Sequence, residues 1–177
     1  MPGNERLFRR RPRRNLRLLA GFLLGIAFGV SACVYSFSGF FPARLKRVWV
    51  PVFQNQTLRY GLEQQVTEAF INALRTDGRL EVVSEDQAAL EIRGTLEHYE
   101  RTPFEHDDAG RVLSYRVVLR ARIGFYDREK QSYYLDPRTY TGRGTYEVDT
   151  ETEEQGIQEA VEDLVDQALR ALFLKEF

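Results

Sequence analysis

Apolar residues recur along this chain with two different periods, which predict strands and helices. Apolar and polar positions alternate with a period of two in residues 88–100 and in residues 113–127, as in strands that have one buried and one exposed face. Residues 46–53 are dense in β-branched and aromatic side chains and predict another strand. Residues 80–83 and 138–148 predict two further strands.

Proline and glycine stand inside two of these strands. Pro51 has no N–H to donate, so it places the first strand at an edge of the sheet or marks the end of that strand. Gly142 and Gly144 lie in the last strand, where they predict a bend or a bulge.

Two segments have the 3.6-residue period of an amphipathic helix. The first is predicted over residues 58–77, with Phe70 on its apolar stripe and Gly78 as its stop. The second begins near Thr152, which forms a capping-box pattern with Gln155.

These elements together predict an α+β fold, a two-layer sandwich. Its mixed sheet is expected to have four strands, or five, with two helices packed on one face, in the order β-α-β-β-β-α. Leu119 and Phe70 are expected to be buried between the sheet and a helix. The other face of the sheet is expected to be open and charged.

Four arginines are expected on this open face: Arg93, Arg116, Arg120 and Arg122. The last three are two or four residues apart on one strand, so their side chains point the same way. One interpretation pairs them with Glu91, Glu97 and Glu147 as solvated cross-strand ion pairs. The other makes them a binding site, because guanidinium groups bind phosphate with two parallel hydrogen bonds.

The N-terminal part of the chain has a different character. Seven arginines and one acid in residues 1–17 precede fifteen uncharged residues, 18–32, and the single cysteine, Cys33, follows directly. This order predicts an export signal at 1–32 that is removed. Residues 30–33, VSAC, resemble a lipobox, in which Cys33 is acylated and becomes the mature N-terminus. An uncleaved membrane anchor and a basic nucleic-acid patch are the alternatives, and the Sec and twin-arginine routes both remain open.

After the signal, residues 33–44 are interpreted as the lipidated cysteine with a flexible tether, and residues 45–177 as one folded domain. Loss of the signal would take seven basic residues and one acid from the chain's 25 and 26, which leaves a net charge near −7. Such a surface disfavours general nucleic-acid binding, which depends on phosphate neutralisation.

Several short motifs, in order, resemble one known family. They are CVYSFSG, VPVFQNQTLRYGLEQQVTEAFINAL, the dipeptide Arg93-Gly94, and SYRVVLRARI. Together they resemble the LptE-like lipopolysaccharide-assembly lipoproteins of Gram-negative bacteria over nearly all of the mature chain. The sequence departs from the family pattern at Val34, where glycine is common, and at residues 86–87, where an Ala-Asp pair is common.

The resemblance implies a non-catalytic lipoprotein that is lipid-anchored on the periplasmic face of the outer membrane. Its expected partner is an LptD-like β-barrel protein, with which it would assemble and export lipopolysaccharide to the outer leaflet. The open-face arginines would then meet the sugar-phosphate part of lipopolysaccharide, or an acidic wall inside the barrel.

Candidate enzyme chemistry is sparse in this sequence. His98 and His106 are the only histidines, and no nucleophile motif, glycine-rich phosphate loop or metal-ligand spacing accompanies them. We therefore predict no catalytic residue, metal or cofactor. Residues 55–57 match a glycosylation sequon, which we interpret as turn chemistry before a helix.

A second non-catalytic class remains open. The stretch VWVPVFQNQT is also similar to the start of periplasmic lipoproteins that activate a peptidoglycan synthase or form a secretion-pore assembly. The later strands and the long final helix fit those families less well.

Overall fold

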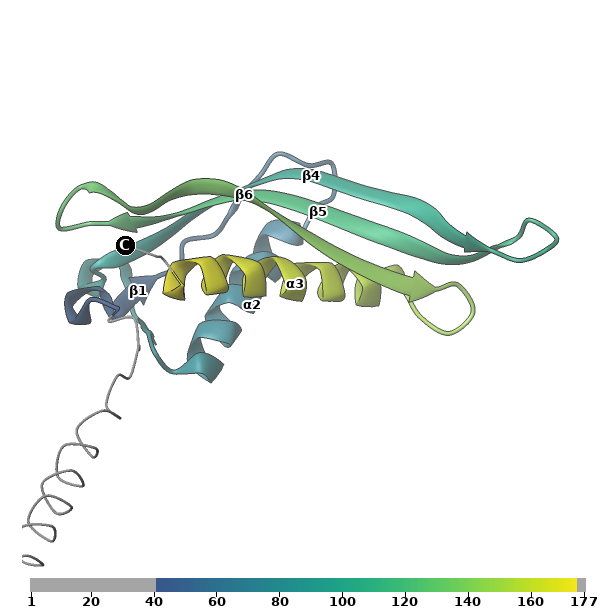
Figure 1. The fold of residues 1–177 in the computed structure, drawn as a ribbon. Helices are drawn as coiled ribbons and strands as arrows, with labels where there is room; N and C mark the ends of the chain where they lie inside the picture. Colours follow the sequence, from purple (N-terminus) through teal and green to yellow (C-terminus); the bar gives the residue numbers. More distant parts are fainter. Residues whose placement is uncertain (1–40, 175–177) are drawn as a thin grey trace, which may run out of the picture. The chain divides into compact units, whose positions relative to one another are not determined.

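Three long antiparallel strands form most of a mixed sheet (Figure 1). The computed structural model describes residues 41–174, which lie in one compact unit, Gly39–Phe177. The long strands are β4 (Leu90–His106), β5 (Val112–Asp127) and β6 (Ser132–Glu147). The alternation predicted for β5 is confirmed, and both β4 and β6 are longer than expected.

Three short strands complete the sheet beside β4. β1 (Arg47–Trp49) lies between β3 (Glu81–Val82) and β4 and is parallel to both. β2 (Gln54–Asn55) pairs with β4 further along that strand, also in parallel. The strand expected at 46–53 is therefore shorter, because it ends before Pro51, which cannot donate to a ladder, and β2 lies beyond the expected range. As a result the sheet has six strands, in the order β3-β1-β4-β5-β6 with β2 beside β4, rather than four or five.

Two helices cover one face of the sheet, as predicted (Figure 1). They are α2 (Leu62–Asp77) and α3 (Glu153–Phe173), and α3 lies along β5 and β6. Short 3-10 helices, η2 (Ala43–Leu45) and η3 (Glu85–Gln87), precede β1 and β4. Among the described residues, no helix combines the length and apolar character that crossing a membrane requires.

The two helices start differently. The capping box of α3 is confirmed, since Gln155 N–H donates to the Thr152 hydroxyl and Thr152 N–H donates to the Gln155 side chain. The start of α2 was expected at residue 58, but the helix begins at Leu62. Gly61 has a φ of 86°, a left-handed conformation that separates residues 58–60 from the helix.

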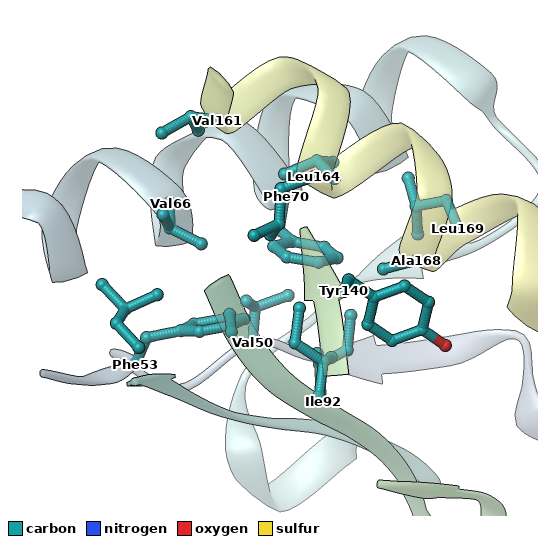
Figure 2. Close-up of a cluster of buried hydrophobic side chains, with 14 of the residues drawn as sticks. Val50, Phe53, Val66, Phe70, Ile92, Tyr140, Val161, Leu164, Ala168 and Leu169 are labelled. Atoms are coloured by element: carbon teal, nitrogen blue, oxygen red, sulfur yellow. The ribbon is translucent and has the colours of Figure 1, made fainter. Parts of the chain in front are cut away.

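The core lies between the sheet and the helices (Figure 2). Leu119 and Phe70 are both buried there, which confirms the predicted register of β5 and the predicted face of α2. Phe53, which comes just before β2, stacks on Phe70 with 5.2 Å between ring centroids. Close packing of this kind makes the core sensitive to changes of single methyl groups.

Gly142 and Gly144 allow α3 to lie directly on β6. A Cβ atom at Gly142 would lie 1.8 Å from the carbonyl oxygen of Ala160, and one at Gly144 would lie 2.0 Å from that of Gly156. The register shifts between β5 and β6 occur elsewhere, between Ile123 and Tyr126 of β5. Of the bend or bulge expected at these two glycines, the bulge is therefore wrong, and their missing side chains make room for the helix.

Side chains on and just before α3 cover the outer edge of β6. Three carboxylates accept hydrogen bonds from backbone N–H groups of β6 at 2.8–3.0 Å: Glu151 from Glu147, Glu159 from Thr145, and Asp163 from Arg143. The side-chain amide of Gln167 donates to the carbonyl of Thr141 at 3.0 Å. Strand residues two apart are separated by about 6.8 Å, and helix residues four apart by about 6 Å. Because these two spacings match, one row of polar side chains can hydrogen-bond successive backbone groups of β6. Without them, the edge of β6 would be free to pair with another strand.

Candidate binding face of the sheet

The four arginines predicted for the open face all lie on the side of the sheet away from the helices. On β5, Arg120 and Arg122 alternate with the buried Leu119 and Ala121, so their side chains point away from the core. Arg93 lies on β4 opposite Gly124, two residues beyond Arg122.

Arg93 is held in place by two neighbours. Its Nε and Nη2 atoms donate to the two oxygens of Glu91 at 2.9 and 3.0 Å. Its guanidinium group also lies over the ring of Tyr126, 3.6 Å from the centroid. The hydrogen bonds that Arg93 donates to Glu91 raise the pKa of Arg93, so this cation is fixed and always charged.

Arg120 and Arg122 are exposed, and within residues 41–174 neither has an ion pair or a side-chain hydrogen bond. Arg122 lies opposite Thr95 and Thr139, and Arg120 lies opposite His98. Their guanidinium groups are therefore available to a ligand.

Arg116 has a different environment. It is half-buried, and its guanidinium group lies 3.6 Å from the ring centroid of Phe104. Four residues of strand place it roughly 14 Å from Arg120. The structure thus brings Arg93 and Arg122 together at one site, with Arg120 two residues from Arg122, and leaves Arg116 apart.

Of the three acids expected to neutralise the arginines, only Glu91 does so. Glu97 falls at a register shift between Leu96 and His98, so no residue of β5 lies directly opposite it. Glu147 lies opposite Ser114. In the described part of the chain, neither acid forms an ion pair with an arginine of the open face.

A hollow of about 480 Å³ adjoins these arginines on the open face. Its charged lining residues are Arg93, Arg122 and Glu91, so that Arg122 supplies the unpaired positive charge. Its apolar walls include Val52, Tyr133 and Pro137. Alternation in the sequence did not reveal these wall residues, because they come from a connection between strands and from a part of β6 that was not predicted. A cationic hollow with apolar walls suits an anionic group carried on a larger, partly apolar molecule.

The family of the chain follows from its sequence as a whole. The model of the family LptE, described as lipopolysaccharide-assembly, matches residues 45–172. The chain belongs to the LptE family. No curated protein matches the sequence.

Solved structures share the fold of this LptE-family chain at low sequence identity. A PelC dodecamer from Paraburkholderia phytofirmans is 19% identical with a TM-score of 0.52, over 77% of this chain and 92% of that one. Protein CT253 of Chlamydia trachomatis is 8% identical with a TM-score of 0.52, over 73% and 98%.

A second groove, of about 770 Å³, lies between the two helices of the LptE-family domain. Its lining includes five acids and two arginines, and the arginines, Arg79 and Arg170, each pair with a neighbouring acid. An anionic ligand would be repelled from this groove. In the described residues no group of three or more His, Cys, Asp or Glu side chains could hold a metal ion.

Cys33 and the predicted signal at 1–32 lie outside the described residues. At the end of the interpreted tether, Phe41 packs against Tyr134 and Phe173, with ring centroids 5.6 and 5.8 Å apart. The chain thus enters the LptE-family domain beside the C-terminal end of α3.

Proposed function

We propose that this protein is a non-catalytic lipoprotein of the outer membrane, anchored on its periplasmic face through an acylated Cys33. In this proposal it partners an LptD-like β-barrel protein in the assembly and export of lipopolysaccharide to the outer leaflet. Its membership of the LptE family of lipopolysaccharide-assembly proteins supports this function.

The observation that carries the proposal is the pair of free cations beside the hollow. Arg120 and Arg122 have no acidic partner among residues 41–174, and Arg122 lines the hollow beside Arg93, whose own charge is paired with Glu91. Guanidinium groups bind phosphate through paired, charge-assisted hydrogen bonds. The arginines of the open face would therefore hold the phosphorylated sugar part of lipopolysaccharide. The apolar walls of the hollow would contact the less polar surface of the same lipopolysaccharide molecule.

The test replaces Arg120 and Arg122 with glutamate in the full chain. Circular dichroism should show an unchanged fold, because both side chains are exposed. Lipopolysaccharide binding should fall more than tenfold, since two attractive charges become repulsive. Arg75→Glu, on the exposed side of α2, is the matched charge-reversal control and should stay within twofold of the wild type.

Two outcomes would count against this proposal. If the double variant keeps wild-type binding to lipopolysaccharide and wild-type co-purification with the barrel, the arginines form only a solvated sheet face. If the wild-type chain instead co-purifies with a peptidoglycan synthase or forms a self-assembled ring, the second class of lipoprotein would replace the first.

A further inference from the structure

The connection between β2 and α2 exposes two large apolar side chains. Leu58 is 99% exposed and Tyr60 is 94% exposed, on either side of Arg59. Single exposed apolar residues are common on protein surfaces. Here two large apolar side chains are almost fully exposed on one short loop. If the loop has a fixed conformation, their exposure needs a further explanation.

The loop is fixed from within by the side chain of Asn55. Its amide nitrogen donates to the carbonyl of Arg59 at 2.8 Å and to Glu63 at 2.7 Å. Its oxygen accepts from the N–H and the hydroxyl of Thr57 at 2.9 and 2.7 Å. This confirms that residues 55–57 form a turn, which closes the loop around the half-buried side-chain amide of Asn55.

The loop is also fixed to the rest of the domain. Arg59 donates to Glu153 at 2.8 Å and to Glu154 at 2.9 Å, both in the first turn of α3. Glu153 in turn accepts from Tyr99 at 2.7 Å and from Arg101 at 3.2 Å, which joins the loop to β4. The arginine therefore points inward, and the side chains on either side of it point outward.

We propose that residues 55–61 form a preformed docking loop whose Leu58 and Tyr60 enter an apolar pocket with a cationic rim on the β-barrel partner. This inference rests on the proposed function and assigns to that partner one specific contact. A loop held in its bound conformation loses little conformational entropy on binding. Tyrosine is among the residues that most often dominate binding energy at protein interfaces.

The charge around the loop indicates the cationic rim. Three acids near the exposed pair, Glu63, Glu153 and Glu154, face two arginines, Arg59 and Arg101, which leaves one net negative charge. The negative charge around the loop would repel an anionic lipid surface. It would attract a pocket bordered by Lys or Arg.

The size of the contact indicates a partner rather than a second copy of the chain. A tyrosine side chain buries roughly 150–250 Å², so one tyrosine with one leucine stays well below the ~800 Å² per partner of a stable interface. The loop alone would therefore not hold two copies together. It would serve as one anchor within a larger contact, as when a barrel surrounds the domain.

The test co-expresses the tagged full-length chain with the β-barrel partner and measures the barrel that is recovered. Leu58→Ser combined with Tyr60→Ser should lower recovery more than tenfold, with an unchanged melting temperature because both side chains are exposed. Leu174→Ser, which changes an apolar side chain that is 71% exposed at the other end of α3, is the control and should stay within twofold of the wild type.

Recovery by the double variant within twofold of the wild type would overturn the docking loop and leave the proposed function intact. A wild-type chain that recovers no barrel would overturn both. An oligomer of the wild-type chain alone, which the double variant dissolves, would assign the loop to a second copy and would also overturn the inference.

Discussion

Asp127 is a buried carboxylate at the end of β5 whose ionised form the fold stabilises. Arg44 pairs with one of its oxygens, and the N–H groups of Glu129 and Lys130 donate to the other at 3.2 and 3.1 Å. The hydrogen bond from Arg44 is the main reason that the pKa of Asp127 is lowered. The turn between β5 and β6 and the start of the domain are thereby joined at one side chain.

We expect Asp127→Asn to lower the free energy of unfolding at pH 7 by about 1–3 kcal/mol, because a charged hydrogen bond becomes a neutral one. The folded-state pKa lies below the unfolded value of about 3.9, so the contribution is complete above about pH 5 and is lost as the pH falls through the lowered pKa. Urea unfolding of both proteins at several pH values measures this. A difference between them that does not shrink on acidification would contradict the assignment.

Gly142 is the residue at which the contact between α3 and β6 is most sensitive. We expect Gly142→Ala to destabilise the domain by about 1–3 kcal/mol or more, because the new methyl group would meet a backbone oxygen of α3. Thermal unfolding measures the change. Thr141→Ala, at the adjacent position on the other face, should cost less than about 0.5 kcal/mol, and equal effects of the two substitutions would disprove the close approach.

Individual residues differ in how far the sequence predicts their environment. The direction of Arg120 and Arg122 followed from strand alternation alone. Their lack of acidic partners did not, because it depends on how β4 and β6 align with β5. A register shift at Glu97 removes one expected partner, and the pairing of Glu147 with Ser114 removes another.

At the scale of elements, β5 and α3 were predictable because burial on one face imposes a clear period. The first part of β6 was missed because Pro137 interrupts it, and the structure accommodates that proline through the register shift beyond Ile123. The start of α2 was placed too early. Leu58 has helical spacing to Leu62, but the turn after Asn55 and the left-handed Gly61 exclude residues 58–60 from the helix.

The covered edge of β6 permits a prediction for α3. Glu159→Ala combined with Asp163→Ala would leave the N–H groups of Thr145 and Arg143 without their acceptors. We expect this variant to self-associate with rising concentration, because unpaired edge donors attract other strands. Sedimentation velocity measures it, with Glu162→Ala, on the side of α3 that lines the groove with α2, as the control. Sedimentation identical to the control at every concentration would show that the edge is protected by other means.

At the scale of the whole molecule, the proposed lipid anchor determines where the domain acts. Cys33→Ala should leave the domain folded but unprocessed or released from the membrane. Two or more fatty chains, at about 0.8 kcal/mol per buried methylene, account for stable anchoring. Metabolic labelling with a fatty acid, followed by membrane fractionation, measures this. Wild-type labelling of the Cys33→Ala protein would refute acylation at this position, and wild-type protein in the inner membrane would refute the proposed location.

The order of β6 and α3 along the chain affects how long the edge of β6 stays uncovered during synthesis. The strand with the vulnerable edge is completed at Glu147, and the helix that covers it follows within a few residues. At roughly 5–20 residues per second, the 26 residues from the end of β6 to the end of α3 take about 1–5 s to follow the strand. The nascent chain is therefore exposed to mispairing at this edge only for that short interval, whereas a chain that stops before the middle of α3 would keep the edge open for its whole lifetime.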